Sequence, residues 1–365
     1  MSNNILGIAG YFDVSGIPVA FKECVAGHIN NTYIVTFDCD HKTEKYILQR
    51  INTYVFKNPH YVMHNIIGVT TYLRSLLEHD GGDVERGTLN FVKSTTGDYF
   101  YKDEDDGYWR MYKYVDNVVS YSLAETPELF EKAGLAFGKF QLQLAGYDAS
   151  DLYETIPDFH NTKKRFARFS EVVASCTTDR QNIAADVIDF VLARGDKCAF
   201  VVDEINAGRI PVRVTHNDTK FNNILMDEQT GDGVCIIDLD TVMPGSALYD
   251  FGDAIRFGAS SALEDETDLD KVFFRTDMFE AFARGYITAS NGTLTAHEIE
   301  SLVMGAYIIT FETGMRFLTD YLENDVYFKT AYPDHNLVRA RNQFKLVYDL
   351  ETRMNEFEDI IKKII

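Results

Sequence analysis

The pattern of apolar residues changes near residue 116, and this change constrains the fold more than any other feature of the chain. Before it, short segments rich in β-branched and aromatic residues predict strands, among them VAFKECV (19–25), NTYIVTF (31–37) and KYILQRI (45–51). After it, apolar residues recur at helical spacing, as in PELFEKAGLAFGKFQLQL (127–144). We therefore predict an α+β protein with two lobes, a β-rich lobe at 1–116 and a mainly helical lobe at 117–365.

One helix interrupts the predicted strands of the first lobe. It begins at Asn58-Pro59, which is a helix-start signal, and ends at Gly81-Gly82, which is a helix-stop signal. Further strands are predicted in TLNFVKS (88–94), GDYFYK (97–102) and GYWRMYKYV (107–115). In the second lobe, helices are predicted at about 163–176, at 181–207 and over most of 268–365, with short strands around residues 210–240.

Charge and composition exclude several classes of partner. The formal net charge is −21, and an acidic protein is repelled by nucleic acid and by anionic membranes, so neither is expected as a partner. No apolar run approaches the roughly 18 residues that a bilayer requires, and the N-terminus lacks a basic secretory region. The 5 cysteines are odd in number and form no C-x-x-C pair, which favours a reducing cytoplasm.

Two polar segments follow predicted strands and suggest one shared site. THNDTKFNN (215–223) contains Asp218 and, five residues later, Asn223, both on a loop after a strand. Phosphoryl transfer needs an oriented acceptor hydroxyl, a metal that bridges phosphate oxygens, and cations around the moving group. The spacing H-x-D-x-x-x-x-N serves the first two needs in protein kinases, and Lys220 lies where those enzymes place a phosphate-facing lysine. His216 and Asn222 are interpreted as structural.

The second segment, CIIDLDT (235–241), supplies the remaining carboxylate. Asp238 ends an apolar strand and would complete a hard-oxygen shell for Mg²⁺, with Asp240 either a ligand of a second metal or structural. A lone H-x-D could be a simple turn, but its combination with Asn223 and a strand ending in Asp is far more specific. The P-loop and dinucleotide-binding motifs are both missing from the sequence. His60 and His64 are interpreted as helix surface rather than as zinc ligands.

These motifs resemble those of the aminoglycoside phosphotransferase and choline kinase group, which has the protein-kinase-like fold, and the resemblance is closer to the N-acetylhexosamine 1-kinases. It runs along nearly the whole chain. The segments that carry it are GHINNTY (27–33), YILQRIN (46–52), VTHNDTKFNNILMD (214–227), IIDLDTVMPGSALYDFGDAIRFGAS (236–260), GMRFLTDYLENDVYF (314–328) and YPDHNLVRARNQ (332–343).

The resemblance implies an ATP- and Mg²⁺-dependent kinase that phosphorylates the anomeric C1 hydroxyl of GlcNAc or GalNAc. Asp218 would orient or deprotonate that hydroxyl, Lys220 would face the phosphates, and Asn223 and Asp238 would bind the metal. The sugar would contact Asp218 and three further residues: Thr241, Arg316 and Tyr327. Asp250 and Asp253 resemble acids that brace the catalytic loop.

Nucleotide binding is assigned by the same resemblance. GHINNTY would cover the nucleotide through Gly27, His28, Asn30 and Thr32, and a hinge at Tyr114, Val115 and Asp116 would meet adenine. Protein kinases carry a lysine on the third strand, paired with a helix glutamate. Here Gln49 takes the lysine's position and the following helix has no acid before Glu78, so this clamp is predicted to be absent.

Two alternatives remain open. The same fold could phosphorylate choline, methylthioribose, homoserine or an aminoglycoside, and four acids of the helical lobe could attract a polycation: Glu312, Asp320, Glu323 and Asp325. Arg316 would repel a cationic acceptor. The second alternative is a non-catalytic pseudokinase, favoured by Gln49 and disfavoured by the intact Asp218, Asn223 and Asp238. The resemblance gives no reason to expect an obligate oligomer, so a monomer is predicted.

Overall fold

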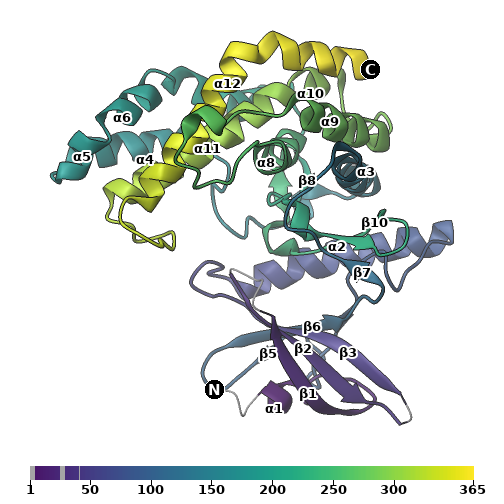
Figure 1. Cartoon of the computed structure of the whole chain (residues 1–365). Coiled ribbons are helices and arrows are strands. Elements are labelled where there is room, and N and C mark those ends of the chain that lie inside the picture. Colours follow the sequence, from purple (N-terminus) through teal and green to yellow (C-terminus); the bar gives the residue numbers. More distant parts are fainter. Residues whose placement is uncertain (1–4, 25–28, 41) are drawn as a thin grey trace.

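The computed structural model describes residues 5–24, 29–40 and 42–365. Gly27 and His28, which were predicted to cover the nucleotide, lie outside the described residues. The chain forms two lobes, a sheet at one end and a larger group of helices at the other (Figure 1). This arrangement confirms the predicted α+β bilobal fold.

The first lobe is an antiparallel sheet with the strand order β1-β2-β3-β6-β4, in which β5 also pairs with β6. Its strands are β1 (Ile17–Cys24), β2 (Asn31–Asp38), β3 (Thr43–Arg50), β4 (Phe91–Val92), β5 (Tyr101–Lys102) and β6 (Tyr108–Lys113). Val35, Leu48 and Met111 are fully buried and pack with the short helix α1 (Ile5–Ala9). The strands predicted at 19–25, 31–37, 45–51 and 107–115 correspond to β1, β2, β3 and β6, whereas those predicted at 88–94 and 97–102 are reduced to the two-residue strands β4 and β5.

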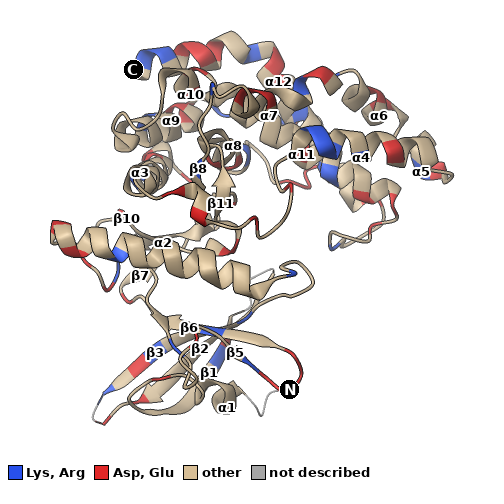
Figure 2. Ribbon diagram, turned by 180° about the vertical axis from the view of Figure 1, so that it is seen from behind, with Lys and Arg blue, Asp and Glu red and all other residues tan. Residues whose placement is uncertain are grey.

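Helix α2 (Pro59–Asp80) lies between the sheet and the helical lobe (Figures 1 and 2). It begins where the Asn58 side chain accepts a hydrogen bond from the backbone N–H of His60, and it ends at Gly81, which has the left-handed φ of 69°. Its buried residues share a core with residues of both lobes, including Val214 and Leu239 of the helical lobe. The helix therefore connects the sheet to the segments that carry the two polar motifs.

The helical lobe is built around α3 (Pro127–Leu144) and α9 (Thr276–Ser290). The two helices cross at glycines, because a Cβ on Gly134 would lie 2.3 Å from the carbonyl oxygen of Phe282 and one on Gly285 would lie 2.2 Å from that of Glu131. The other helices are α4 (Thr162–Ser175), α5 (Asp179–Ile183), α6 (Ala185–Leu192), α7 (Phe200–Asn206), α8 (Ala247–Gly258), α10 (Ala296–Glu300), α11 (Leu302–Leu322) and α12 (His335–Ile364).

Two predictions for this lobe were wrong in detail. The single helix expected at 181–207 is divided, because Ala184 leaves the helical conformation and Gly195 begins a 3-10 turn. Helix α8 was not predicted at all. Its residues from Ala247 to Arg256 are all buried, but Asp250, Asp253 and Arg256 recur at helical spacing, so a local signal for this helix was present and was overlooked.

Short strands complete the helical lobe and hold the two motifs. They are β7 (Val118–Val119), β8 (Arg213–Thr215), β9 (Ile224–Asp227), β10 (Gly233–Ile236) and β11 (Met243–Gly245). They form two small antiparallel sheets, β10-β9-β7 and β11-β8. Among the described residues, no helix combines the length and apolarity that crossing a bilayer requires. Acidic residues are spread over both lobes (Figure 2).

Candidate active site

The two polar motifs lie side by side because the strands that flank them are paired. Thr215 of β8 is the register partner of Met243 of β11, and Ile224 of β9 is that of Ile236 of β10. The loops that join these strands therefore run next to each other. The backbone N–H of Ile237 donates to the carbonyl of Asn223 at 2.9 Å, and the imidazole Nε2 of His216 lies 2.9 Å from the carbonyl oxygen of Ile237.

Asp250 of α8 holds the first loop, residues 216–223, through hydrogen bonds to its backbone. One of its carboxylate oxygens accepts from the N–H of His216 at 3.0 Å and the other accepts from that of Asn217 at 2.7 Å. These bonds support Asn217 in a left-handed conformation with φ of 64°, which a non-glycine residue adopts at a cost. Burial raises the pKa of Asp250, while the hydrogen bonds favour its ionised form.

Thr241 joins the second loop to the first. Its hydroxyl donates to the carbonyl of His216 at 2.8 Å, and its own carbonyl accepts from the side chain of Asn217 at 2.9 Å. Thr241 is buried, and its hydroxyl is engaged by the loop backbone rather than directed to a substrate. Thr241, which was predicted to contact the sugar, therefore holds the two loops together in this structure.

Asp218 is held between a cation and an amide. Lys220 Nζ lies 2.8 Å from one carboxylate oxygen, and Asn223 Nδ2 donates to the other at 3.2 Å and to the Asp218 carbonyl at 2.8 Å. Burial by itself raises the pKa of Asp218, but Lys220, His216 and Asn223 outweigh it and hold the pKa below its usual value. The carboxylate is therefore ionised at neutral pH and can accept a hydrogen bond.

Asp238 is the one carboxylate of the two motifs with no protein partner among the described residues. It has a left-handed backbone (φ 58°, ψ 53°) at the end of β10. Desolvation in the cleft and repulsion from Asp240 and Asp218 raise its pKa to about 6, although solvent still reaches the side chain. A bound cation would relieve this repulsion.

The oxygen atoms at this point suit Mg²⁺. The amide nitrogen of Asn223 is directed to Asp218, which leaves its Oδ1 without a partner in the described part of the chain, and the Asp238 carboxylate is likewise unpartnered. Within that part, no three His, Cys, Asp or Glu side chains are arranged to hold a metal on their own. Mg²⁺ binds through one or two protein oxygens with phosphates and water, so Asn223 and Asp238 could hold it without a third protein ligand.

Asp240 was considered as a second metal ligand, and the structure assigns its carboxylate to other partners. One oxygen contacts Nη1 of Arg110 on β6, and the other accepts from Asn30 Nδ2 at 2.5 Å. Asn30 and Thr32 were predicted to meet the nucleotide. Here Asn30 contacts Asp240, and the Thr32 hydroxyl accepts from Gln49 at 3.1 Å.

The predicted hinge residues lie where the chain crosses from the sheet to the helical lobe. The N–H of Tyr114 donates to the carbonyl of Lys45 on β3 at 3.0 Å, and Val115 is buried. Asp116 leads into β7, which pairs with β9 through Val118 and Asp227. The hinge is thus fixed at both ends by strand pairing.

Arg316 of α11 has an aromatic surrounding and a free guanidinium. Its Cζ lies 5.6 Å from the ring centre of Phe159, 5.5 Å from that of Phe328 and 5.9 Å from that of Tyr327. No hydrogen bond or ion pair to Arg316 exists among the described residues, so the salt bridge that would make it merely structural is not found there. Tyr327 is 54% exposed.

Glu312 connects this arginine to the catalytic loop. It lies one helical turn before Arg316 and accepts from the Thr162 hydroxyl at 2.6 Å, and His160 Nδ1 lies 3.0 Å from it. The other imidazole nitrogen of His160 lies 3.4 Å from the carbonyl oxygen of Asn217, next to Asp218. Burial opposes ionisation of Glu312, but His160, Arg165 and Arg316 lower its pKa to about 2.

His160 and Arg165 were missed by the sequence analysis. Both come from the segment before and within α4, outside every block that carries the resemblance, and neither belongs to a recognisable motif. Arg165 Nε lies 3.3 Å from Glu312, and burial together with repulsion from Arg316 lowers the pKa of this guanidinium. Only the fold brings these residues to the site.

The four acids considered as a polycation site are already paired with protein groups. Besides Glu312, the Asp320 carboxylate accepts from the N–H groups of Tyr327 and Phe328, at 2.8 and 2.9 Å. Glu323 contacts Arg168, and Asp325 contacts Arg180 Nη1 at 2.6 Å. These acids therefore shape the helical lobe and do not present a free anionic surface.

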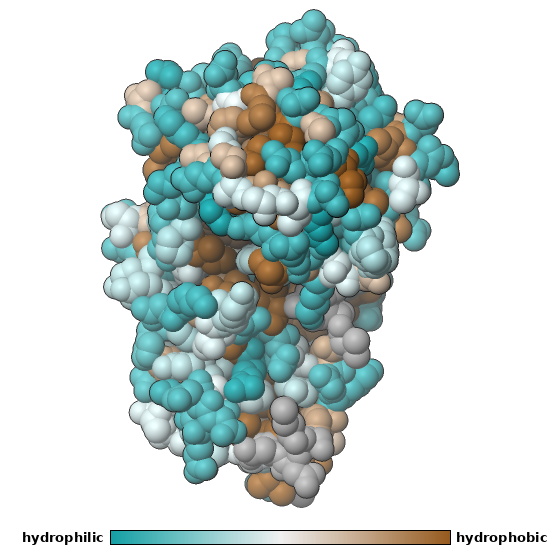
Figure 3. Space-filling view, turned by 90° about the vertical axis from the view of Figure 1, so that its left-hand side faces the viewer, coloured by the Kyte–Doolittle hydropathy of each residue, from teal (hydrophilic) through white to brown (hydrophobic). Residues whose placement is uncertain are grey.

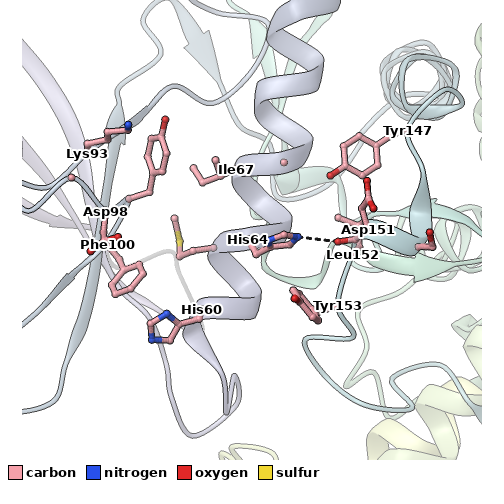
Figure 4. A pocket seen from close by; sticks show the side chains of 15 residues that line it. His60, His64, Ile67, Lys93, Asp98, Phe100, Tyr147, Asp151, Leu152 and Tyr153 are labelled. Atoms are coloured by element: carbon pink, nitrogen blue, oxygen red, sulfur yellow. Dashed lines mark hydrogen bonds between the residues drawn. The ribbon is translucent and has the colours of Figure 1, made fainter.

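A cavity of about 790 Å³ lies along α2, apart from these residues (Figure 4). It is lined by α2, by the segment from Lys93 to Phe100 and by residues 147–153. His60 packs edge-on against Phe100, and His64 Nε2 lies 2.9 Å from the carbonyl oxygen of Asp151. Neither polar motif lines this cavity. Figure 3 shows apolar residues in a hollow near the middle of the molecule.

Comparison with known proteins identifies the family. The sequence pattern of the phosphotransferase enzyme family matches residues 22–287. The chain belongs to this family. Its fold is that of small-molecule kinases, as the arrangement of Asp218, Asn223 and Asp238 on paired loops indicates.

Solved structures agree on the fold. An ethanolamine kinase of Plasmodium vivax is similar with a TM-score of 0.54 at 17% identity, over 89% of this chain and 82% of that one. A choline kinase of Cryptosporidium parvum gives 0.54 at 12% identity, over 96% and 92%. An aminoglycoside phosphotransferase of Alicyclobacillus acidocaldarius gives 0.51 at 11%, over 98% and 95%. At such identities the likeness concerns the fold and leaves the acceptor open.

Proposed function

We propose that this chain is an N-acetylhexosamine 1-kinase, which transfers the γ-phosphoryl group of ATP to the C1 hydroxyl of GlcNAc or GalNAc with Mg²⁺. The observation that carries this choice is the acceptor side of the site. An unpaired Arg316 is surrounded by aromatic rings, and the nearby acids already have protein partners. Such a surface suits a neutral, hydroxyl-rich ring better than a cation.

The donor side follows from the two loops. We assign the nucleotide to residues 1–116 together with the hinge at Tyr114, Val115 and Asp116, and the acceptor to residues 117–365. Spectinomycin phosphotransferase, which is similar with a TM-score of 0.50 at 12% identity, was solved with ADP and spectinomycin, which supports a nucleotide in this cleft. Mg²⁺ held by Asn223 and Asp238 would neutralise charge on the phosphate oxygens.

Asp218 receives the acceptor. Its ionised carboxylate accepts the hydrogen bond of the C1 hydroxyl and takes the proton as the new P–O bond forms and the bond to ADP breaks. An anomeric hydroxyl is more acidic than other sugar hydroxyls, so a carboxylate with a lowered pKa is basic enough to assist late in the step. Lys220, 2.8 Å from Asp218, lies where it can oppose the charge of the transferred group.

Arg316 and Tyr327 orient the sugar. A guanidinium presents planar donors that match adjacent hydroxyls or an acetamido oxygen. The aromatic rings around it give apolar faces for the ring carbons, in keeping with small-ligand sites that combine aromatic walls and a few polar groups. Arg165, which forms an ion pair with the same Glu312, adds positive potential to the acceptor side. This potential disfavours binding of a cationic acceptor such as choline, ethanolamine or an aminoglycoside. Thr241 contributes by holding the loop.

ATP as the donor and 5 unpaired cysteines support a place in the cytoplasm. Because both substrates are small molecules and every assigned residue comes from this one chain, we propose that a monomer suffices for the reaction.

The test is an acceptor panel. The protein is incubated with Mg·ATP and, separately, GlcNAc, GalNAc, choline, ethanolamine, methylthioribose, homoserine and kanamycin, and ADP release is followed. The proposal predicts ADP release with the two amino sugars and a product whose phosphorus couples to the anomeric proton in a ³¹P–¹H spectrum. Release only with a cationic acceptor would replace the proposed activity, and release with none would favour a pseudokinase.

A further inference from the structure

A buried ion pair joins the sheet to the second motif. The side chains of Arg110 on β6 and Asp240 each keep only 3% of their exposure, and Nη1 of the arginine contacts Oδ1 of the aspartate. Gln49 on β3 supports the arginine, because its Oε1 accepts from Nε at 3.0 Å and from Nη2 at 2.8 Å. A buried pair is stable only when its remaining donors and acceptors are satisfied in this way.

The other atoms of Asp240 are also occupied. Oδ2 accepts from Asn30 Nδ2 at 2.5 Å, and Asn30 in turn accepts from the N–H of Asn52 at 2.9 Å. The carbonyl of Asp240 accepts from the Thr155 hydroxyl at 3.0 Å. Asp240 therefore has no free carboxylate oxygen for a metal, whereas Asp238, two residues earlier, has no protein partner in the described part of the chain.

The position of the pair within the sheet is informative. Gln49 and Arg110 are register partners on the antiparallel strands β3 and β6, so their side chains share one face of the sheet. Gln49 takes the position at which protein kinases carry their lysine. The cation on this face of the sheet is therefore Arg110 on β6, one strand away from the position of the kinase lysine on β3. Its acidic partner, Asp240, comes from the second polar motif, whereas the glutamate of protein kinases comes from the neighbouring helix.

We propose that Arg110 and Asp240 are positioning residues that replace the lysine–glutamate clamp and hold Asp238 in place for Mg²⁺ binding. Asp238 has a left-handed backbone, a conformation that aspartate adopts more readily than most non-glycine residues but still at a cost. Asp240 anchors the chain two residues later to the sheet through Arg110 and to the start of β2 through Asn30. The inference rests on the proposed function in one respect, that the chain binds a nucleotide with Mg²⁺.

The test measures nucleotide binding and needs no acceptor. The affinity for ADP is determined by calorimetry with and without Mg²⁺ in the wild type, Arg110→Met, Asp240→Asn and the double variant Gln49→Lys with Arg110→Met. Loss of groups that orient a metal ligand weakens metal binding about 10- to 100-fold, so both single variants are expected to lose that much affinity for Mg·ADP. Binding of ADP without Mg²⁺ is expected to change little.

The double variant separates the clamp from simple packing. A lysine at position 49 lies opposite position 110 and can supply the charge for Asp240, so the double variant is expected to regain most of its Mg·ADP affinity. Lys102→Met on β5, which removes an exposed ion pair with Asp106, is the matched control and is expected to bind as the wild type does.

Several results would overturn the clamp. One is wild-type Mg·ADP affinity in both Arg110→Met and Asp240→Asn, and another is failure of Gln49→Lys to restore binding. If Arg110→Met does not fold, as circular dichroism would show, Asp240→Asn keeps the shape of the side chain and decides the question alone. A wild-type protein that bound ADP equally with and without Mg²⁺ would instead refute the proposed function, and this inference with it.

Discussion

The two halves of the cleft treat charge in opposite ways. On the donor side, Asp238 has no protein partner in the described part of the chain and is repelled by Asp240 and Asp218. The two cations of this half, Arg110 and Lys220, are already paired with Asp240 and Asp218, so one acid is left over. On the acceptor side, Arg316 has no hydrogen bond or ion pair among the described residues and lies near a second arginine, Arg165. The nearest acid, Glu312, is already shared by Arg165, His160 and Thr162, so one cation is left over on this half. The proposed function uses this difference, with a metal–nucleotide complex on one side and an acceptor that is not a cation on the other.

The largest effect on turnover is expected at Asp218, which lies between the donor side and the acceptor side. Asp218→Asn removes the acceptor of the sugar proton, and turnover should fall about 10²- to 10⁴-fold, the usual range for loss of a general base. Mg·ADP affinity should be retained, because the proposed metal ligands Asn223 and Asp238 remain. Initial rates and calorimetry on the same preparation check this, and undiminished turnover would remove Asp218 from its role.

The second largest effect is expected on the acceptor side, at Arg316. Arg316→Met should raise the KM for the sugar about 10- to 100-fold, which corresponds to one or two hydrogen bonds from a charged group, and leave the KM for ATP unchanged. Arg339→Met is the matched control, since its guanidinium also lies over an aromatic ring, that of Phe317 at 5.3 Å. An Arg316 variant that gained activity on choline and lost none on the sugar would contradict the proposed contact.

On the donor side, the stabilisation of the protein by Mg·ADP is expected to depend on pH. Asp238 has a pKa raised to about 6, above its unfolded value near 3.9, so its ionisation opposes folding and this cost is present above pH 6 and absent at low pH. Mg·ADP should relieve the cost, whereas below pH 6 a proton competes with the metal. The rise in Tm caused by Mg·ADP is therefore expected to be larger at pH 8 than at pH 5, and Asp238→Asn should abolish the difference. An equal rise at both pH values would contradict the assignment.

The sequence predicted what is encoded locally. β1, β2 and β3 follow from short apolar segments, and α2 and α3 follow from caps and prolines, with Asn58 and Thr126 accepting the first N–H groups as such residues do. The two motif loops were found because their spacing is short and the chemistry demands those residue types.

The remainder depends on distant pairing. Arg110 and Gln49 are 61 residues apart and meet only through the register of β3 and β6, and Arg110 meets Asp240 across 130 residues. His160 reaches Glu312 across 152 residues. No local pattern carries such information. α8 is a different case, because Asp250, Asp253 and Arg256 recur at helical spacing and this local signal was overlooked.

The smallest effect is expected outside both halves. His64→Ala alters an exposed residue at the cavity of Figure 4 and removes its contacts with the carbonyl of Asp151 and the ring of Tyr153. Turnover should be unchanged, and the free energy of unfolding should change by about 0.5 kcal/mol or less, as is usual for surface substitutions. A tenfold loss of turnover would show that this cavity belongs to the active site.

The most direct measurement of the central claim is the binding of Mn²⁺ together with ADP, followed by electron paramagnetic resonance, to the wild type, Asp238→Asn and Asp218→Asn. The claim is that the two loops form one metal–nucleotide site in which Asp238 holds the metal and Asp218 holds the acceptor. It predicts a protein-bound Mn·ADP signal in the wild type and in Asp218→Asn, and its loss in Asp238→Asn. An undiminished signal in Asp238→Asn would contradict it.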